Sequence, residues 1–327
     1  QQDHSSLGSR PFFLVDLGGQ AGSGTTPADD PRLPAAELRL AQLACPSLGL
    51  ATDGAAVTGA ATRLAASLDL VVTTEEELGR VLARIEAAPL AAMTLAQLLR
   101  HNTGCTVTDG LLAESLAYST LQSGPEFAAW LAGEGRGGRE ISDEEAGGPI
   151  VMTRDGACLI VELNRPQRRN AFSAGLRDAL AGALDMVVRD GTIEKVLVSG
   201  RGPDFCSGGD LDEFGTLKDP ASAHALRSAR NLGRTIDTLR GRMEFRLHGA
   251  CVGAGIELAA FASRVVADKD SFFQLPELSM GLVPGAGGTV SMLGRIGRQR
   301  LAYMALSGVK VPAPLALAWG LIDKVSG

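Results

Sequence analysis

The second half of the chain alternates hydrophobic strands with amphipathic helices. Residues 150–163 (IVMTRDGACLIVEL) predict a β-hairpin that turns at residues 154–156. Residues 173–190 carry apolar side chains at helical spacing after Ser173, which is a typical N-cap residue. The alternation continues with predicted strands at 195–200, 243–249 and 264–270 and a helical segment from about 220 to 239. Such alternation predicts an α/β fold with mostly parallel strands and right-handed crossovers.

The first half has a weaker pattern of the same kind. Short apolar runs predict strands at 12–17, 46–55 and 69–73. Residues 74–88 predict a helix with acidic residues in its first turn, and 94–102 and 109–134 predict further amphipathic helices. Glycine- and proline-rich stretches at 18–34 and 133–149 predict a mobile loop and an interdomain linker. We therefore divide the chain into residues 1–148 and 149–327.

Composition narrows the possible partners and cofactors. A net charge of −6 argues against nucleic-acid binding, and the apolar runs are shorter than the roughly 18 residues that a membrane span requires. Five scattered cysteines without a CxxC pair, and four histidines without metal-ligand spacing, favour a reduced cytoplasmic protein without a metal. The first residues lack the pattern of a secretory signal, so we expect a cytoplasmic location.

Four glycine- or proline-containing turns in the second half have the features of one active site. They are LNRPQRRNAF (163–172), FCSGGDLDEF (205–214), HGACVGAGIEL (248–258) and LPELSMGLVPGAGGT (275–289). Bare glycine turns at helix starts can aim backbone N–H groups at a carbonyl oxygen, as an oxyanion hole requires. The alternative is that these are ordinary strand-to-helix turns.

Two glutamates stand next to these turns in apolar surroundings. Glu257 lies within the run CVGAGIELAAF, and Glu277 directly follows Pro276. Each could be a first-turn helix acid that backbone amides satisfy. Together they resemble a carboxylate pair for proton transfer, because a buried carboxylate needs a partner or a shifted pKa. The glycine spacing does not fit a dinucleotide or Walker motif, and there is no GxSxG nucleophile elbow.

These segments, from about residue 150 to 325, resemble the enoyl-CoA hydratase/isomerase (crotonase) superfamily. The resemblance assigns the oxyanion amides to Gly209 and Ala254 and the catalytic acids to Glu257 and Glu277, at the 20-residue interval of the family's hydratases. It also implies a coenzyme A-binding surface, made of Arg169, Asn170, Ala171, Ser207, Gly208, Asp210 and Leu211.

The resemblance further implies a spiral of ββα units, assembly into homotrimers or hexamers, and acyl-CoA thioester substrates without another cofactor. Because both glutamates are present, we expect a hydro-lyase that adds water across the C2–C3 double bond of an enoyl-CoA, as in fatty acid metabolism. An enoyl-CoA isomerase, another crotonase-type enzyme and a non-catalytic acyl-CoA-binding protein are the alternatives.

The sequence departs from the family at two places. Leu275 stands where a polar residue is common, and the sequence stops at Gly327, where hydratases of the family continue with helices that cover the acyl pocket. Residues 109–134 resemble those closing helices. We therefore interpret residues 1–148 as a degenerate crotonase-like unit whose helices dock on the second half, with an unrelated helical extension as the alternative.

Overall fold

A computed structural model describes residues 8, 10–18, 27–52, 59–133, 147–217 and 219–326. Most of the predicted loop at 18–34 and of the predicted linker at 133–149 lies outside these residues. The same holds for the end of the predicted strand at 46–55.

A six-stranded sheet forms the frame of the second half. Its strands follow the order β12-β9-β7-β6-β5-β4, and all neighbours run parallel except β4 and β5. The bounds are β4 Ile150–Asp155, β5 Cys158–Leu163, β6 Lys195–Gly200, β7 Met243–Leu247, β9 Arg264–Asp268 and β12 Lys324–Ser326. The predicted hairpin is confirmed, because β4 and β5 pair antiparallel around Gly156, whose φ is 56°. The predicted α/β class is confirmed as well.

A second, three-stranded sheet carries the turns that the sequence analysis singled out. Strand β8 (Ala250–Val252) pairs in parallel with β10 (Phe272–Gln274), which pairs antiparallel with β11 (Val311–Pro312). The register sets Val252 beside Gln274, so the two chain segments that follow these strands leave the sheet side by side. These segments contain Glu257 and Glu277.

The helices of the second half begin at side-chain caps in several places. Helix α7 (Ala174–Arg189) starts as predicted, where the Ser173 side chain accepts a hydrogen bond from the Leu176 amide at 3.2 Å. The single helical segment expected at 220–239 is wrong. Two helices, α8 (Pro220–Ala229) and α9 (Leu232–Thr238), replace it, because the Asn231 side chain caps a new helix by accepting from the Arg234 amide at 3.0 Å.

Shorter helices complete this half around a long one. The long helix is α11, Gly288–Ser307. The others are η1 Pro166–Arg168, η2 Leu211–Glu213, η3 Arg240–Arg242, α10 Ala254–Glu257, η4 Ala259–Phe261, η5 Glu277–Met280 and α12 Ala313–Trp319.

The described part of the first half joins a small parallel sheet to six helices. The order is β1 (Phe13–Asp16), α1 (Leu33–Ala41), β2 (Ser47–Leu50), α2 (Ala60–Ser67), β3 (Leu70–Val72), α3 (Glu75–Ala87), α4 (Pro89–Asn102), α5 (Val107–Gln122) and α6 (Pro125–Gly133). Neighbouring strands in β1-β2-β3 are parallel. The predicted helix at 109–134 is two helices, because Pro125 begins a new one after the break at Ser123-Gly124.

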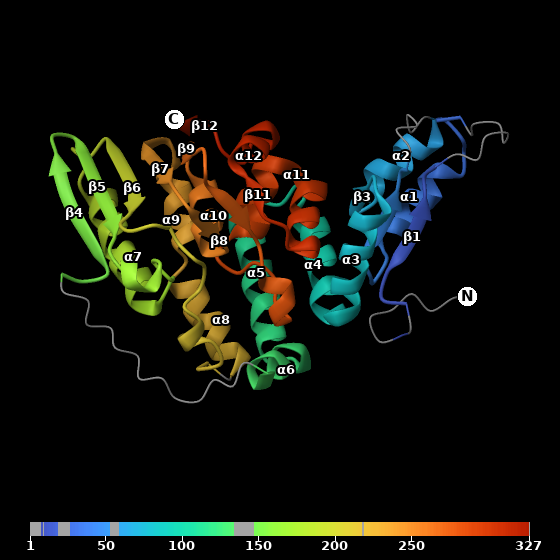
Figure 1. Cartoon of the computed structure of the whole chain (residues 1–327), viewed down its shortest axis with the longest axis horizontal. Helices are drawn as coiled ribbons and strands as arrows, with labels where there is room; N and C mark the ends of the chain where they lie inside the picture. The colour runs from blue at the N-terminus through green and yellow to red at the C-terminus, as the bar shows by residue number, and fades with distance from the viewer. Residues whose placement is uncertain are drawn as a thin grey trace.

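The two halves share one hydrophobic core. Leu99, Leu111 and Phe127 from the first half belong to the same buried cluster as Phe261 and Met292 from the second. Helices α3, α4 and α5 all contact α11, and Figure 1 shows α5 running alongside α8. The predicted boundary near residue 148 stays a prediction, but the N-terminal helices pack against the second half.

A buried ion pair also joins the two halves. Asp69, which is 1% exposed, pairs with Arg298 of α11 at 2.7 Å and with Arg100 of α4. Among the described residues, no single helix has the length and apolar character to cross a membrane. The pair α3 and α4 meets that test only together, and it bends by 110°.

Candidate active site

A short bridge brings the two glycine turns together. Cys206 and Cys251 form a parallel β-bridge. The Cys206 amide donates to the Ala250 carbonyl at 3.1 Å, and the Val252 amide donates to the Cys206 carbonyl at 3.0 Å. A Cβ on Gly253 would lie 3.7 Å from the Gly208 Cα. The chain thus leaves both strands at the same point, and the turns at 207–210 and 253–255 are neighbours.

The two predicted oxyanion amides belong to these turns. The bridge between Phe172 and Gly209 uses the amides of Phe172 and Asp210, at 2.7 and 3.0 Å. Within the part of the chain that the structure describes, the amides of Gly209 and Ala254 have no hydrogen-bond acceptor. Ala254 is the first residue of α10, where an amide lacks a partner inside the helix. Both amides are therefore available to a substrate oxygen.

Glu257 ends α10 and lies 2% exposed in the core. Its Oε2 accepts hydrogen bonds from the Ala286 and Gly288 amides, both at 2.8 Å, at the start of α11. Gly288 is required there, because a Cβ would lie 2.6 Å from the Glu257 Cγ. These two bonds fix the carboxyl group and leave Oε1 free to point toward Gly253.

Glu277 begins η5 and turns its carboxyl group toward the same point. A Cβ on Gly253 would lie 2.6 Å from Glu277 Oε1 and 3.8 Å from Glu257 Oε1. The two Oε1 atoms therefore converge over Gly253. The structure brings the predicted pair together beside the two free amides.

The pKa values of the pair differ because their partners differ. Burial raises the pKa of Glu257 to about 7, while the two amides of α11 oppose that rise. Burial, with the Glu257 charge second, raises the pKa of Glu277 well above its usual range. Glu277 Oε2 is shielded from solvent and has no hydrogen-bond partner among the described residues. At neutral pH the geometry favours a protonated Glu277 next to an ionisable Glu257, which is an acid next to a base.

The predicted coenzyme A turn is built tightly around Asn170. This side chain donates to the carbonyls of Arg201 and Asp204, both at 2.9 Å, and accepts from the Arg165 amide at 2.8 Å. Asn170 and Arg169 both have left-handed backbones, with φ of 52° and 51°. The Asn170 side chain thus holds the turn and is not free to contact a ligand.

Three of the other predicted coenzyme A residues, Ala171, Gly208 and Asp210, are buried, and the rest are at least partly exposed. Asp210 is buried in ion pairs with Arg165 at 3.0 Å and Arg168 at 2.9 Å, and Arg169 pairs with Asp204 at 2.6 Å. The Ser207 amide donates to the Arg169 carbonyl at 3.0 Å. Ala171, Gly208 and Leu211 lie next to these residues in the chain. Their role in binding stays a prediction.

The sequence analysis missed three residues next to the carboxylate pair. Glu114 and Tyr118 come from α5 of the first half, and Arg227 comes from α8. Glu114 is 3% exposed, and the Arg227 guanidinium carbon lies 3.7 Å from the centre of the Tyr118 ring. The run LLAESLAY around Glu114 shows the same signal as the run around Glu257, a single carboxylate among apolar residues.

Aromatic side chains from both halves cover the Gly209 turn. A Cβ on Gly209 would lie 2.8 Å from the Phe214 ring. That ring packs against Phe127 and Trp130 of α6, with ring centres 6.3 and 5.9 Å away. Helix α6 therefore contributes to the wall around the candidate oxyanion hole.

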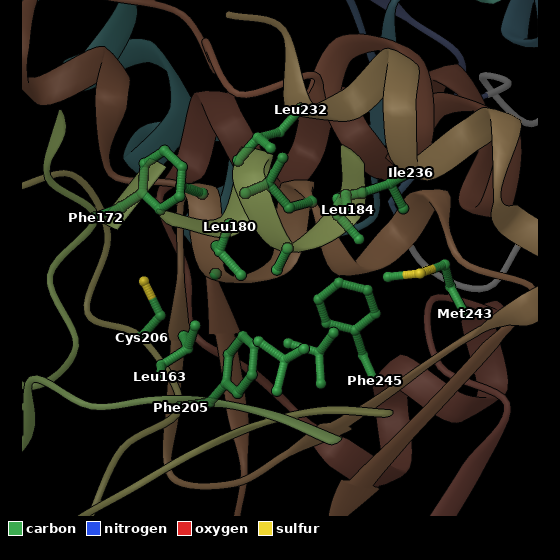
Figure 2. Close-up of a pocket in the computed structure, with 16 residues that line it drawn as sticks. Leu163, Phe172, Leu180, Leu184, Phe205, Cys206, Leu232, Ile236, Met243 and Phe245 are labelled. Carbon is green, nitrogen blue, oxygen red and sulfur yellow. The ribbon is translucent and has the colours of Figure 1, made fainter. Parts of the chain in front are cut away.

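Two cavities lie near the pair. One of about 30 Å³ lies behind the Gly209 and Ala254 turns, and Figure 2 shows its entirely apolar lining, including Phe172, Leu184 and Phe245. A larger cleft of about 540 Å³ separates α3 and α6 from η5, with Arg84 and Trp130 in its wall.

The described part of the chain contains no cluster of three or more histidine, cysteine, aspartate or glutamate side chains arranged to hold a metal ion. Backbone amides at the start of α11 hold two of the carboxylates that gather at the site, Glu257 and Glu114.

Comparison with known proteins shows the family to which the chain belongs. The family model for enoyl-CoA hydratase/isomerase matches residues 153–327. The chain is 31% identical over 176 residues to the 2,3-dehydroadipyl-CoA hydratase of Escherichia coli, covering 54% of this chain and 68% of that protein. It is 32% identical over 178 residues to the 1,2-epoxyphenylacetyl-CoA isomerase of Escherichia coli, covering 51% of this chain and 65% of that protein.

Solved structures agree with the sequence matches. The enoyl-CoA hydratase of Thermoplasma volcanium has a TM-score of 0.51 and 31% identity, covering 55% of this chain and 72% of that one. The predicted crotonase fold is thereby confirmed for the second half. The chain spans 61% to 68% of the length of three curated relatives, and the family match leaves out the first 152 residues.

Proposed function

Because the chain belongs to the enoyl-CoA hydratase/isomerase family, we propose that it hydrates the C2–C3 double bond of an acyl-CoA thioester. One observation carries this proposal. Oε1 of Glu257 and Oε1 of Glu277 converge over Gly253, beside the amides of Gly209 and Ala254, which have no acceptor among the described residues. This arrangement provides a base, an acid and two donors for a developing oxyanion.

The proposed reaction uses each group once. Glu257, as a carboxylate, takes a proton from water while the water oxygen bonds to C3. Electrons of the double bond move toward the thioester oxygen, where the Gly209 and Ala254 amides stabilise the enolate charge. Glu277, in its acid form, then donates its proton to C2. A proton passes back from Glu257 to Glu277, so the net change is the addition of one water.

Isomerisation of a double bond is the second candidate. It would need only the acid–base group at C2 and the oxyanion amides, and one of the similar proteins is named an isomerase. The fixed Glu257 favours hydration, because two hydrogen bonds to α11 hold its carboxyl group and leave one oxygen free for water. A non-catalytic acyl-CoA-binding protein would not require this arrangement.

A spectrophotometric assay separates these activities. Crotonyl-CoA loses its conjugated-enone absorbance on hydration, whereas a 3-enoyl-CoA gains that absorbance on isomerisation to the 2-enoyl thioester. We expect loss of absorbance with crotonyl-CoA and a 3-hydroxyacyl-CoA product by mass spectrometry. Gain of absorbance with the 3-enoyl thioester, without hydration of crotonyl-CoA, would favour the isomerase. Inactivity on both, with tight binding of a saturated acyl-CoA, would favour the binding protein.

We further propose that coenzyme A enters as part of the substrate and that no other cofactor takes part. A homotrimer or hexamer in the cytoplasm, acting in fatty acid metabolism, is the assembly and setting that the family suggests. Sedimentation of the purified chain tests the assembly directly.

A further inference from the structure

Glu114 shares the start of α11 with Glu257. The Gly287 amide donates to Glu114 Oε1 at 2.7 Å, and the Thr289 amide donates to Glu114 Oε2 at 3.0 Å. The amides of Ala286 and Gly288, which alternate with these, donate to Glu257 at 2.8 Å. Two carboxylates, one from each half of the chain, therefore divide the successive amides of one helix end between them.

A chain of side-chain hydrogen bonds fixes Glu114 further. Asn102 Nδ2 of α4 donates to Thr289 Oγ1 at 3.1 Å and to the Thr289 carbonyl at 3.2 Å. The Thr289 hydroxyl group is then oriented to donate its own proton to Glu114 Oε2, at 2.6 Å. Glu114 thus accepts three hydrogen bonds, and all of them favour its ionised form.

Charged and titratable groups from every neighbouring element face these carboxyls. Glu277 and Glu257 interact with the Glu114 charge, Arg227 is attracted to Glu257, and Arg84 is attracted to Glu277. Three further titratable side chains lie nearby: Tyr118 on α5, Cys206 beside the Gly208 turn, and His224 on α8. The His224 Nδ1 lies 2.9 Å from Ser115 Oγ. Both arginines lower the pKa of the carboxyl they face, so their attraction opposes the repulsion among the three acids.

Building on the proposed function, we propose that Glu114 is a positioning residue for the catalytic pair. It holds the start of α11 in the place where that helix end binds Glu257, and once Glu114 is ionised its negative charge keeps the acidic proton on Glu277. The N-terminal half thereby takes part in acid–base catalysis without touching the reacting atoms.

The order in which the three carboxyls titrate gives this role a measurable consequence. Burial raises the pKa of Glu257 to about 7. Burial first, and the Glu257 charge second, raise the pKa of Glu114 to about 8, and the pKa of Glu277 is raised well above its usual range. The charges of Glu257 and Glu114 both raise the pKa of Glu277, so Glu277 holds its proton more tightly once the other two are ionised. Removing the Glu114 charge should lower the pKa of Glu277 and leave that of Glu257 nearly unchanged.

The pH dependence of kcat/KM with crotonyl-CoA tests the proposal. In Glu114→Gln we expect the alkaline limb, where Glu277 loses its proton, to move down by about one pH unit. The reason is that the variant lacks a like charge that acts on Glu277 in a low-dielectric site. The acidic limb should stay in place. Glu114→Asp keeps the charge and should keep the alkaline limb even where turnover falls. Glu86→Gln removes an exposed charge from α3 and should leave both limbs unchanged.

A purely structural Glu114 would give a different result. Its loss would lower kcat/KM by the same factor at every pH and would move neither limb. An unshifted alkaline limb in a folded Glu114→Gln variant therefore overturns the proposal.

Infrared titration provides a readout that needs no turnover. The C=O band of protonated Glu277 is identified by its loss in Glu277→Gln. We expect this band in the wild type at about pH 8, and its titration at lower pH in Glu114→Gln. If the wild type fails to hydrate enoyl-CoA, the proposed function fails, and the infrared titration still decides the role of Glu114. If Glu114→Gln does not fold, absence of the band from the wild type at that pH overturns the proposal.

Discussion

Substitution of Gly253 by alanine tests the geometry on which the site depends. Gly253 has φ 49° and ψ −122°, a region that a residue with a side chain occupies only with strain. Its Cβ would also lie 2.6 Å from Glu277 Oε1, closer than real Cβ contacts come. The Glu277 carboxyl group would have to move away from the point where it meets Glu257.

We expect Gly253→Ala to lose about 1–3 kcal/mol of the free energy of unfolding, which is the usual cost of such a backbone conformation. Displacement of the acid by about 1 Å should lower turnover by roughly 10²-fold. Urea unfolding and crotonyl-CoA hydration measure the two effects on the same preparation.

Gly79→Ala is the matched control for that substitution. Gly79 is an exposed residue inside α3, and no heavy atom lies within 4 Å of the position that a Cβ would take there. Alanine at this position should stabilise the helix by about 0.5–1 kcal/mol and leave turnover unchanged. A Gly253→Ala variant that unfolds like the wild type and keeps turnover within about threefold would refute the geometric reasoning.

Three further predictions concern the amide, the buried charge and the first half. Ala254→Pro should fold, because proline is tolerated at a first helical position, yet lose roughly 10²–10³-fold in turnover with its amide, whereas Ala254→Gly should keep most activity. Glu257→Gln should become more stable relative to the wild type as pH rises. The pKa of Glu257 is about 7 in the folded state and 4.5 in the unfolded state, so the wild type loses stability as pH rises between these values. Melting temperatures from about pH 5 to about pH 8 measure the difference, which should reach about 3 kcal/mol at most. Residues 149–327 expressed alone should aggregate, because the apolar surface under α4, α5 and α6 would face water; a soluble, active fragment would contradict this.

The sequence predicts the second half of the fold well, because its strands and turns are local patterns. The hairpin at 150–163 and the cap at Ser173 follow from residues close together in the chain. The prediction of one helix at 220–239 fails at Asn231. The sequence pattern allows Asn231 inside a helix, but in the structure its side chain caps a new helix. The helical stretch predicted at 109–134 forms two helices, and Pro125 begins the second.

The candidate site is predicted in part for a physical reason. Parallel pairing of β8 and β10 sets the segments after them side by side, so the spacing between Glu257 and Glu277 reflects the register of those strands. Glu114 was missed, since its hydrogen-bond partner Gly287 lies 173 positions away and no local pattern joins them. A lone carboxylate in an apolar run marks both Glu114 and Glu257, but it does not show what each one contacts.

The separate roles of Glu257 and Glu277 are the centre of the proposed chemistry, and exchange of the C2 proton measures them apart. A saturated acyl-CoA incubated in D₂O acquires deuterium at C2 through the oxyanion-stabilised enolate, which needs Glu277 but no attacking water. Mass spectrometry measures the exchange, and the loss of crotonyl-CoA absorbance measures hydration. We predict that Glu257→Gln loses roughly 10²–10⁴-fold in hydration yet keeps most of the exchange, whereas Glu277→Gln loses both. Exchange that survives in a folded Glu277→Gln variant, or hydration that survives in Glu257→Gln, would contradict these roles.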